Sequence, residues 1–224
     1  MAEPRLSVVV PVRNGAATLD AALASLARHG GADETIVIDD GSTDASAEIA
    51  RRHGARLLRQ EARGPAAARN RGLEAARGAL VGFLDADDVW DGVDAASDLR
   101  LAALSAEPDL AGALGRIQIL LCPPDGEPER AAGPFHATQL GALLVRREVV
   151  ARIGPFDGAL EPAEDLDWFL RARRLGLRFR EVPQATLLYR RHGGNLTSDP
   201  RRRTHAFLAA LRREIERKRS GTCG

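Results

Sequence analysis

The chain has 224 residues, of which 44% are hydrophobic and 28% are charged, and its formal net charge is +1. This length fits one large domain, or a domain with a small lobe, and the apolar content is enough for a substantial core. The near-zero net charge excludes a global attraction to nucleic acid. Cys122 and Cys223 lie far apart and predict neither a disulfide framework nor a metal-binding cysteine cluster.

The sequence shows neither the pattern of a signal peptide nor a long apolar span. We therefore expect a soluble, cytoplasmic protein.

The first half of the chain alternates apolar runs with segments of helical periodicity, which predicts an α/β fold. Strands of this kind are joined by right-handed crossovers into a mostly parallel, Rossmann-like sheet with helices on both faces. The expected strands are 6–12, 35–38, 55–59 and 79–84. The expected helices begin at Thr18, at Ser42 or Thr43, and at Ala66, and they end near Gly30, Gly54 and Gly78.

The second half is less regular and predicts a smaller mixed region. Helices are expected at 94–105, 146–153, 162–175 and 201–219, and strands at 112–121, 138–145, 179–182 and 185–189, with a loop or hairpin at 123–134.

Acidic residues cluster where predicted strands end. Asp85, Asp87 and Asp88 follow the strand 79–84, and Asp39-Asp40 end the strand 35–38. Ligands of parallel sheets bind beyond the carboxyl ends of the strands, so both clusters should meet in one crevice. Carboxylates that are crowded together repel each other, and a Mg²⁺ or Mn²⁺ ion that carries phosphates would relieve that repulsion. The plainer interpretation is a polar turn whose aspartates cap helices.

The Gly-x-Gly-x-x-Gly fingerprint of dinucleotide-binding folds is absent after the first strand, which argues against a nicotinamide-dependent dehydrogenase. An aspartate at the end of the second strand could still bind a nucleotide base or ribose.

The chain resembles family 2 glycosyltransferases with the GT-A fold. Seven short motifs carry the resemblance over residues 5–198, and they stand in the family's order. They are Leu6-Ser7-Val8-Val9-Val10-Pro11-Val12-Arg13-Asn14, Ile38-Asp39-Asp40-Gly41-Ser42-Thr43-Asp44, Gly64-Pro65-Ala66-Ala67-Ala68-Arg69-Asn70-Arg71-Gly72, Phe83-Leu84-Asp85-Ala86-Asp87-Asp88, Ile153-Gly154-Pro155-Phe156-Asp157, Glu164-Asp165 and Tyr189-Arg190-Arg191-His192.

The resemblance implies a role for each of nine residues. Pro11, Arg13 and Asp39 would line the nucleoside pocket, with Asp39 or Asp40 on the base. Arg69 would orient the nucleotide or the sugar, and Asp85 would hold the ribose or the donor sugar. Asp87 would bind the metal, Mn²⁺ or Mg²⁺, and His192 would complete the metal shell. Asp165 would be the catalytic base. Separately from the resemblance, the glycines Gly193-Gly194 predict a mobile loop over 192–198 that closes over the donor.

The implied reaction is the inverting transfer of a sugar from a nucleotide-diphosphate sugar, most simply a UDP-sugar, to an unknown acceptor hydroxyl. A metal on the diphosphate stabilises the charge of the leaving group, and a carboxylate accepts the proton of the attacking hydroxyl. Polysaccharide or glycoconjugate synthesis would be the setting.

Several of these residues also have purely structural interpretations. Asp44 and Asp88 are expected to cap helices or turns. Asp167 should face outward or support the site, and Trp168 either stacks on an acceptor sugar or belongs to the core. Acidic residues such as Asp165 are favoured in a first helical turn by the helix dipole alone.

Two other functional classes remain open. A sugar-nucleotide nucleotidyltransferase would carry a glycine-rich phosphate loop after its first strand, and Pro11-Val12-Arg13-Asn14-Gly15 is not one. A non-catalytic nucleotide-sugar binding module would have lost acidic site residues that this chain retains.

We expect one GT-A domain over 1–200, with a nucleotide-binding half at 1–90 and an acceptor-side half at 91–200. A basic helix and tail at 201–224 would follow. That helix is either a solvated surface or a peripheral contact with anionic lipid at the inner face of the membrane. No nucleic acid is expected as a partner.

Overall fold

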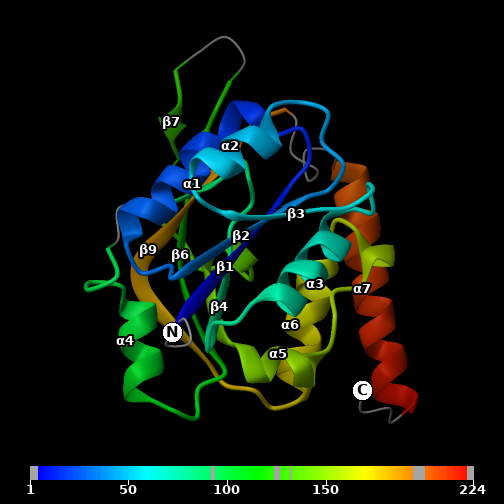
Figure 1. Ribbon diagram of the computed structural model, residues 1–224. Helices are drawn as coiled ribbons and strands as arrows, with labels where there is room; N and C mark the ends of the chain where they lie inside the picture. The colour runs from blue at the N-terminus through cyan, green and yellow to red at the C-terminus, as the bar shows by residue number, and fades with distance from the viewer. Residues whose placement is uncertain (1–4, 92–93, 124–126, 132, 194–199, 221–224) are drawn as a thin grey trace.

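The computed structural model describes residues 5–91, 94–123, 127–131, 133–193 and 200–220. Within this part of the chain one 9-stranded sheet has the order β3-β2-β1-β4-β8-β6-β9-β5, and β7 pairs with β6 (Figure 1). The strands are β1 (Leu6–Val12), β2 (Glu34–Asp39), β3 (Arg56–Arg59), β4 (Leu80–Phe83), β5 (Val89–Trp90), β6 (Gly112–Leu121), β7 (Glu129–Arg130), β8 (Leu143–Arg146) and β9 (Phe179–Arg191).

The described helices cover both faces of this sheet. They are α1 (Ala16–His29), α2 (Ser46–Arg52), α3 (Pro65–Ala75), α4 (Leu99–Ala106), α5 (Arg147–Ile153), α6 (Glu164–Arg174) and α7 (Pro200–Ser220), with the 3₁₀ turns η1 (Leu140–Ala142) and η2 (Gly158–Leu160).

Strand direction brings four carboxyl ends to one edge of the sheet. β1 is parallel to β2 and to β4, and β2 is parallel to β3. β8 runs antiparallel to both β4 and β6, while β6 is parallel to β9. Two reversals restore the direction, so β9 points the same way as β4. The residues that follow β1, β2, β4 and β9 therefore lie at the same edge.

The core has two layers because the central strands are buried on both faces. In β1, Val8 and Val10 pack with apolar residues of α1, α2 and α4. Val9, which points the other way, packs with residues of α3, α5 and α6. This explains why 6–12 lacks the polar alternation of a half-exposed strand. In Figure 1 the first group of helices lies to the left of the strands and the second group to the right.

Two glycines show how closely the elements pack. A Cβ on Gly72 of α3 would lie 2.2 Å from Cγ1 of Val9, so only glycine lets α3 approach β1 this closely. Gly30 ends α1 with a φ of +68°, the left-handed conformation that favours glycine at a helix end.

The predicted elements of the first half are present, but α1 begins at Ala16, two residues before the predicted Thr18, and the start of α2 differs further. α2 begins at Ser46, not at Ser42 or Thr43. Ser42 instead belongs to the turn after β2, because its backbone N–H donates to Asp39 (2.7 Å) and its hydroxyl accepts from the backbone N–H of Asn14 (2.9 Å).

The second half departs further from prediction. β5 was not expected, the helix predicted at 94–105 begins only at Leu99, and most of the strand predicted at 138–145 is loop and η1. The two short strands expected at 179–182 and 185–189 are one strand, β9. Pro183 does not end it, because the register between β6 and β9 shifts at this point, between Leu114 and Ile117.

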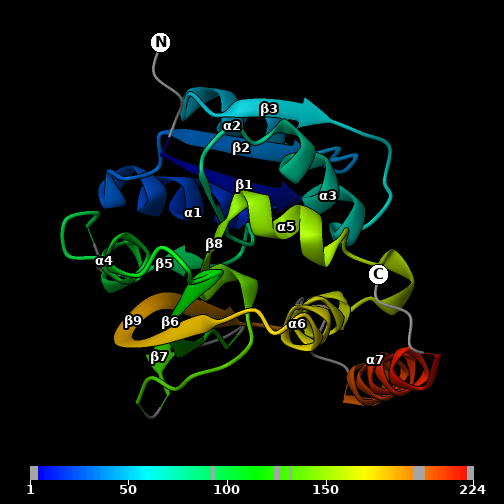
Figure 2. The same ribbon diagram turned by 90° about the horizontal axis from the view of Figure 1, so that it is seen from below.

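The basic helix predicted at 201–219 is α7, which lies outermost, beyond α6, in both views (Figure 2). Ala206 and Ala210 pack against Ala163. Arg213 pairs with Asp157, and Arg217 pairs with Asp167. None of the described helices has both the length and the apolar character needed to span a membrane.

Candidate active site

A cavity of about 870 Å³ lies at the sheet edge where the four carboxyl ends meet. It is bounded by the turns after β1, β2 and β4, by the first turns of α1, α3 and α6, and by the end of β9. Eight of the nine predicted site residues line it: Pro11, Arg13, Asp40, Arg69, Asp85, Asp87, Asp165 and His192. Six of the seven sequence motifs thus contribute to the lining of one cavity, and the motif at 153–157 does not.

The ninth residue, Asp39, lies behind the wall of the cavity. It is fully buried, accepts from the backbone of Ser42 and pairs with Nε of Arg59 at 2.9 Å. Asp40 lines the cavity, and its carboxylate accepts from the backbone N–H groups of Arg63 (2.8 Å) and Gly64 (2.9 Å). Asp39 therefore holds the turn after β2, and Asp40 is the member of the pair that faces the cavity.

The turn after β4 crowds three carboxylates together. Asp88 is almost fully buried and accepts from the backbone N–H of Arg190 (2.8 Å). Burial, together with the negative charges of Asp85 and Asp87, raises the pKa of Asp88 well above its ordinary value. Asp88 therefore ties the turn to β9, and of the two structural roles that we expected for it, the cap of a helix or of a turn, this contact fits the turn.

Asp87 and His192 converge from β4 and β9. Nε2 of His192 lies 3.2 Å from Oδ2 of Asp87. Burial and the nearby charge of Asp85 raise the pKa of Asp87, so a negative charge is held there at a cost that a cation would offset. His192 already lies beside Asp87, whereas residues 194–198 of the predicted closing loop lie outside the described residues.

The Asp87–His192 pair fits a metal that also binds substrate. Among the described residues, no group of three His, Cys, Asp or Glu side chains could enclose a metal ion. Mg²⁺ is usually held by one or two carboxylates, with phosphate oxygens and waters completing the shell. A carboxylate and an imidazole suit that arrangement and also suit Mn²⁺.

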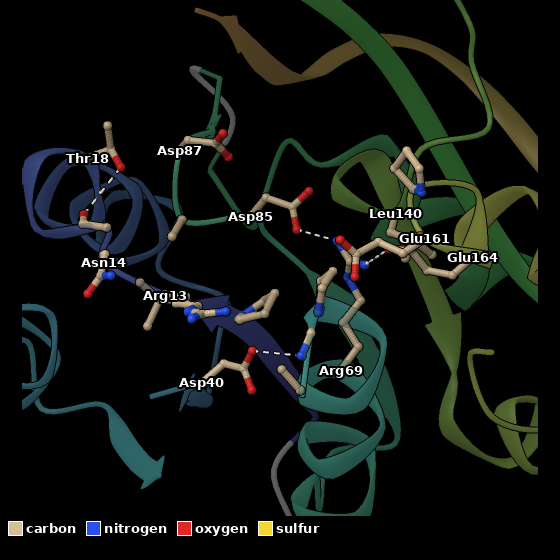
Figure 3. Close-up of a pocket in the computed structure, with 18 of the residues that line it drawn as sticks. Arg13, Asn14, Thr18, Asp40, Arg69, Asp85, Asp87, Leu140, Glu161 and Glu164 are labelled. Atoms are coloured by element: carbon tan, nitrogen blue, oxygen red, sulfur yellow. Dashed lines mark hydrogen bonds and ion pairs between the residues drawn. The ribbon is translucent and has the colours of Figure 1, made fainter. Parts of the chain in front are cut away.

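Arg69 lies at the centre of the cavity wall and joins its two sides (Figure 3). It is buried, with Nη2 2.7 Å from Asp85 and Nη1 2.7 Å from Glu164. The charges of these two carboxylates raise the pKa of Arg69 although burial opposes it. Both terminal nitrogens are thus engaged by protein groups, so the structure gives Arg69 a bridging position that the sequence did not reveal.

Asp165 stands in the first turn of α6 and faces the cavity. Its Oδ1 accepts from the backbone N–H of Leu166 at 2.7 Å. Burial and the negative charge of Glu164 raise the pKa of Asp165 to about 7. A carboxyl group that titrates there is suited to general acid–base chemistry near neutral pH.

Other acidic and aromatic residues of the motifs are structural. Asp44 accepts from the backbone N–H groups of Ala16 and Ser46, as expected of a cap. Asp167 is fully buried between Arg171 and Arg217, so the expectation that it faces outward was wrong, and its support of the site stays a prediction. Trp168 is in the core, where it stacks on Phe156 with ring centroids 5.6 Å apart.

Some cavity residues were not predicted as part of the site. Glu161 and Glu164 line it beside Asp165, and their proximity to that residue in sequence was the available signal. Gln139 and Leu140 also line it, but they come from a segment without a motif. The pairing of β8 between β4 and β6 brings that segment to the cavity.

The family model described as "Glycosyl transferase family 2" matches residues 7–97. The chain is also 31% identical over 186 residues to the PGL/p-HBAD biosynthesis glycosyltransferase of Mycobacterium bovis, a match that covers 76% of this chain and 70% of that protein. The chain belongs to the family 2 glycosyltransferases.

This family 2 glycosyltransferase has further relatives of greater length. It is 32% identical over 204 residues to the succinoglycan biosynthesis protein ExoU of Rhizobium meliloti, over 78% of this chain and 58% of that protein. It is 30% identical over 223 residues to the uncharacterized glycosyltransferase EpsJ of Bacillus subtilis, over 88% of this chain and 64% of that protein. The chain thus spans about three fifths of the length of these relatives.

Solved structures share the fold at low sequence identity. The mannosyltransferase PcManGT of Pyrobaculum calidifontis, in complex with GDP-Man and Mn²⁺, superimposes with a TM-score of 0.73 at 21% identity, over 96% of this chain and 65% of that one. The glucosyl-3-phosphoglycerate synthase of Mycobacterium tuberculosis, in a complex with Mn²⁺ and UDP, superimposes with a TM-score of 0.70 at 19% identity, over 94% of this chain and 80% of that one. The glycosyltransferase described here therefore has an α/β fold similar to GT-A structures, as predicted.

Proposed function

We propose that this glycosyltransferase is metal-dependent and inverting, and that it transfers a sugar from a nucleotide-diphosphate sugar to an acceptor hydroxyl. One observation carries the proposal: a single cavity contains the Asp87–His192 pair on one side and Asp165, with its pKa raised to about 7, on another. The name of the ExoU relative supports a setting in polysaccharide or glycoconjugate synthesis.

The donor would occupy the part of the cavity between β1, β2 and β4. Pro11 and Arg13 would line the nucleoside pocket, with Asp40 on the base and Asp39 supporting the turn behind it. Asp85 would hold the ribose or the donor sugar, and Arg69 would orient that sugar through Asp85. A UDP-sugar is the donor we favour, and the GDP-Man complex of PcManGT keeps guanosine donors in the panel to be tested.

Asp87 and His192 would hold Mn²⁺ or Mg²⁺ together with the donor diphosphate. A bound cation of this kind supplies positive charge that stabilises the departing nucleoside diphosphate.

Asp165 would act as the base. The acceptor hydroxyl attacks the anomeric carbon while Asp165 takes its proton, and the bond from that carbon to the diphosphate oxygen breaks. Attack from the face opposite the leaving group inverts the anomeric configuration in a single displacement, without a nucleophilic carboxylate.

The first experiment is titration calorimetry of UDP and GDP with and without Mn²⁺, on the wild type and on Asp87→Ala. The wild type should bind one of the two nucleotides more tightly when Mn²⁺ is present. Asp87→Ala should lose this Mn²⁺-dependent increase in affinity, because no nearby neutral group replaces the carboxylate. Equal Mn²⁺-dependent binding by the variant would remove Asp87 from the metal site.

A panel of sugar nucleotides then separates the three functional classes. A transferase consumes a donor, a nucleotidyltransferase forms a sugar nucleotide from nucleoside triphosphate and sugar phosphate, and a binding module does neither.

For α7 we propose peripheral contact with anionic lipid at the cytoplasmic face of the inner membrane, which would also place the protein in the cytoplasm. Phe207, Leu208 and Ile215 are exposed large apolar side chains of this helix, and Arg212 is exposed near them. An apolar stripe flanked by cations suits a charged bilayer surface. The protein should co-sediment with vesicles that contain phosphatidylglycerol, and Leu208→Glu should abolish this; equal sedimentation of both proteins would refute the contact.

A further inference from the structure

Glu164 and Arg69 form a buried ion pair in the wall of the cavity. Nη1 of Arg69 lies 2.7 Å from Oε1 of Glu164, and both side chains are more than nine-tenths buried. The same guanidinium binds Asp85 through Nη2, as the dashed lines in Figure 3 show. Arg69 belongs to α3, Asp85 follows β4 and Glu164 opens α6, so one charge joins three elements.

The second oxygen of Glu164 is enclosed. Oε2 has almost no accessible surface, and no hydrogen-bond donor reaches it among the described residues. Nε of Arg69 is likewise enclosed and without an acceptor. Oε2 is therefore not placed to touch a sugar, and Oε1 already accepts from Arg69, so we argue that Glu164 acts through the groups beside it. Those groups are Arg69 and its own neighbour in sequence, Asp165.

We propose that Glu164 is a positioning residue for Asp165: its buried carboxylate, held by Arg69, keeps Asp165 able to accept a proton and links this base to the donor-side Asp85. The proposal rests on the proposed function, in which Asp165 is the base. It assigns to Glu164 a role distinct from a second base and from a substrate contact.

The charges around Asp165 act in opposite directions. Burial acts with the negative charges of Glu164 and Asp85 to raise the pKa of Asp165, while the positive charge of Arg69 and the N–H of Leu166 lower it. Glu161 is a further acidic residue in the lining of the same cavity. Removing Glu164 should therefore lower this pKa, and removing the charge of Arg69 should raise it. Replacing a residue that only fills space would not shift the pKa of Asp165 in a direction set by the charge of that residue.

The test is a ¹³C NMR titration of side-chain carboxyl groups in protein labelled at aspartate, with neither donor nor metal added. The signal of Asp165 is assigned by its loss in Asp165→Asn, and in the wild type it should titrate near 7. We expect Glu164→Gln to lower this midpoint by about one pH unit or more, the usual effect of one nearby charge. Arg69→Met should raise it by a similar amount, and Arg69→Lys, which keeps the charge, should leave it closer to the wild type.

Asp167→Asn is the matched control. Asp167 lies in the same helical turn and is buried between Arg171 and Arg217, but it does not line the cavity. Its loss should lower the melting temperature without moving the midpoint of Asp165. Should Glu164→Gln fail to fold, the comparison of Arg69→Met with Arg69→Lys carries the test alone. Midpoints that move in the same direction for Glu164→Gln and Arg69→Met, or that do not move at all, would overturn the proposal.

The titration needs no turnover, so it separates this inference from the proposed function. If midpoints move as expected but no donor is consumed, the electrostatic coupling stands and the assigned reaction fails. If a donor is consumed, the acidic limb of the pH profile of kcat/KM should move with the midpoint in each variant.

Discussion

Asp165 combines a place at the cavity surface with a charge state that changes near neutral pH. Its pKa is raised to about 7, above the ordinary value for aspartate, first by burial and then by Glu164. Below that pH the folded protein holds the proton on Asp165, so the group cannot accept another. Above it the carboxylate is free to do so.

We therefore expect turnover of the donor to rise with pH through about 7 and then to level off. The measurement is kcat/KM against pH at saturating Mn²⁺. Asp165→Asn should lose about 10²–10⁴-fold in turnover, the usual contribution of a general base, and should lose this acidic limb, while donor affinity stays the same. If the rise of kcat/KM with pH is unchanged in Asp165→Asn, the group that titrates is not Asp165.

The acidic residues Asp40, Asp85 and Asp87 of the site could be recognised from the sequence, because each follows an apolar run where a strand ends. The ion pairs could not be recognised in this way. Arg69 and Glu164 are 95 positions apart, and nothing in either segment indicates that they meet. The buried state of Asp39 is equally hidden, since a strand-end aspartate looks the same whether it faces a ligand or a turn.

Among the elements, α1, α4 and β5 are joined by a buried polar network that reaches the cavity segment 139–140. His29 at the end of α1 lies 3.0 Å from Asp98, the N-cap of α4, and Nη2 of Arg100 lies 2.7 Å from the same carboxylate. The guanidinium of Arg100 stands over the ring of Trp90, 4.6 Å from its centroid, and the Trp90 indole donates to the carbonyl of Gly141 at 3.0 Å. Gly141 follows the cavity residue Leu140, so this network helps to hold that segment in place.

Asp98→Ala should destabilise the protein by about 3–5 kcal/mol, because it leaves the fully buried Arg100 without its carboxylate. The hydrogen bond from His29 and the charge of Arg100 hold the pKa of Asp98 below its usual range although burial opposes this. Urea unfolding measures the free energy of unfolding of each variant. The control is Asp94→Ala, because Asp94 is exposed and only accepts hydrogen bonds within its own turn. Apart from the loss of those hydrogen bonds, this control should change the free energy of unfolding by less than about 0.5 kcal/mol. Similar losses in both variants would show that the network contributes little.

Contacts between distant parts of the chain explain why the second half was harder to predict. β5 has only two residues, and α4 begins where Asp98 can cap it, several positions after its helical periodicity starts. β9 continues through Pro183 because the register shift with β6 accommodates the irregularity. Tertiary pairing decided these boundaries. Long apolar runs such as β1 were predictable because burial on both faces leaves a direct mark on the sequence.

In the molecule as a whole, one sheet passes through both predicted halves, since β4 of the first pairs with β8 of the second. The boundary expected near residue 90 separates roles within this sheet and stays a prediction. The cavity lies where the two halves meet: Asp40 and Asp87 come from the first half, and Glu161, Asp165 and His192 come from the second. The sequence motifs do not identify the acceptor, because the predicted acceptor-side half contributes lining segments, such as 139–140, that contain no motif.

The most direct test of the central claim is ¹H NMR of the first sugar released from an α-linked donor in the presence of Mn²⁺, recorded before the anomers equilibrate. The donor is the one that the panel identifies, and water serves as the acceptor. We predict that the wild type releases the β-anomer and that Asp165→Asn releases almost none. Release of the α-anomer, or equal rates for the two proteins, would contradict an inverting displacement with Asp165 as its base.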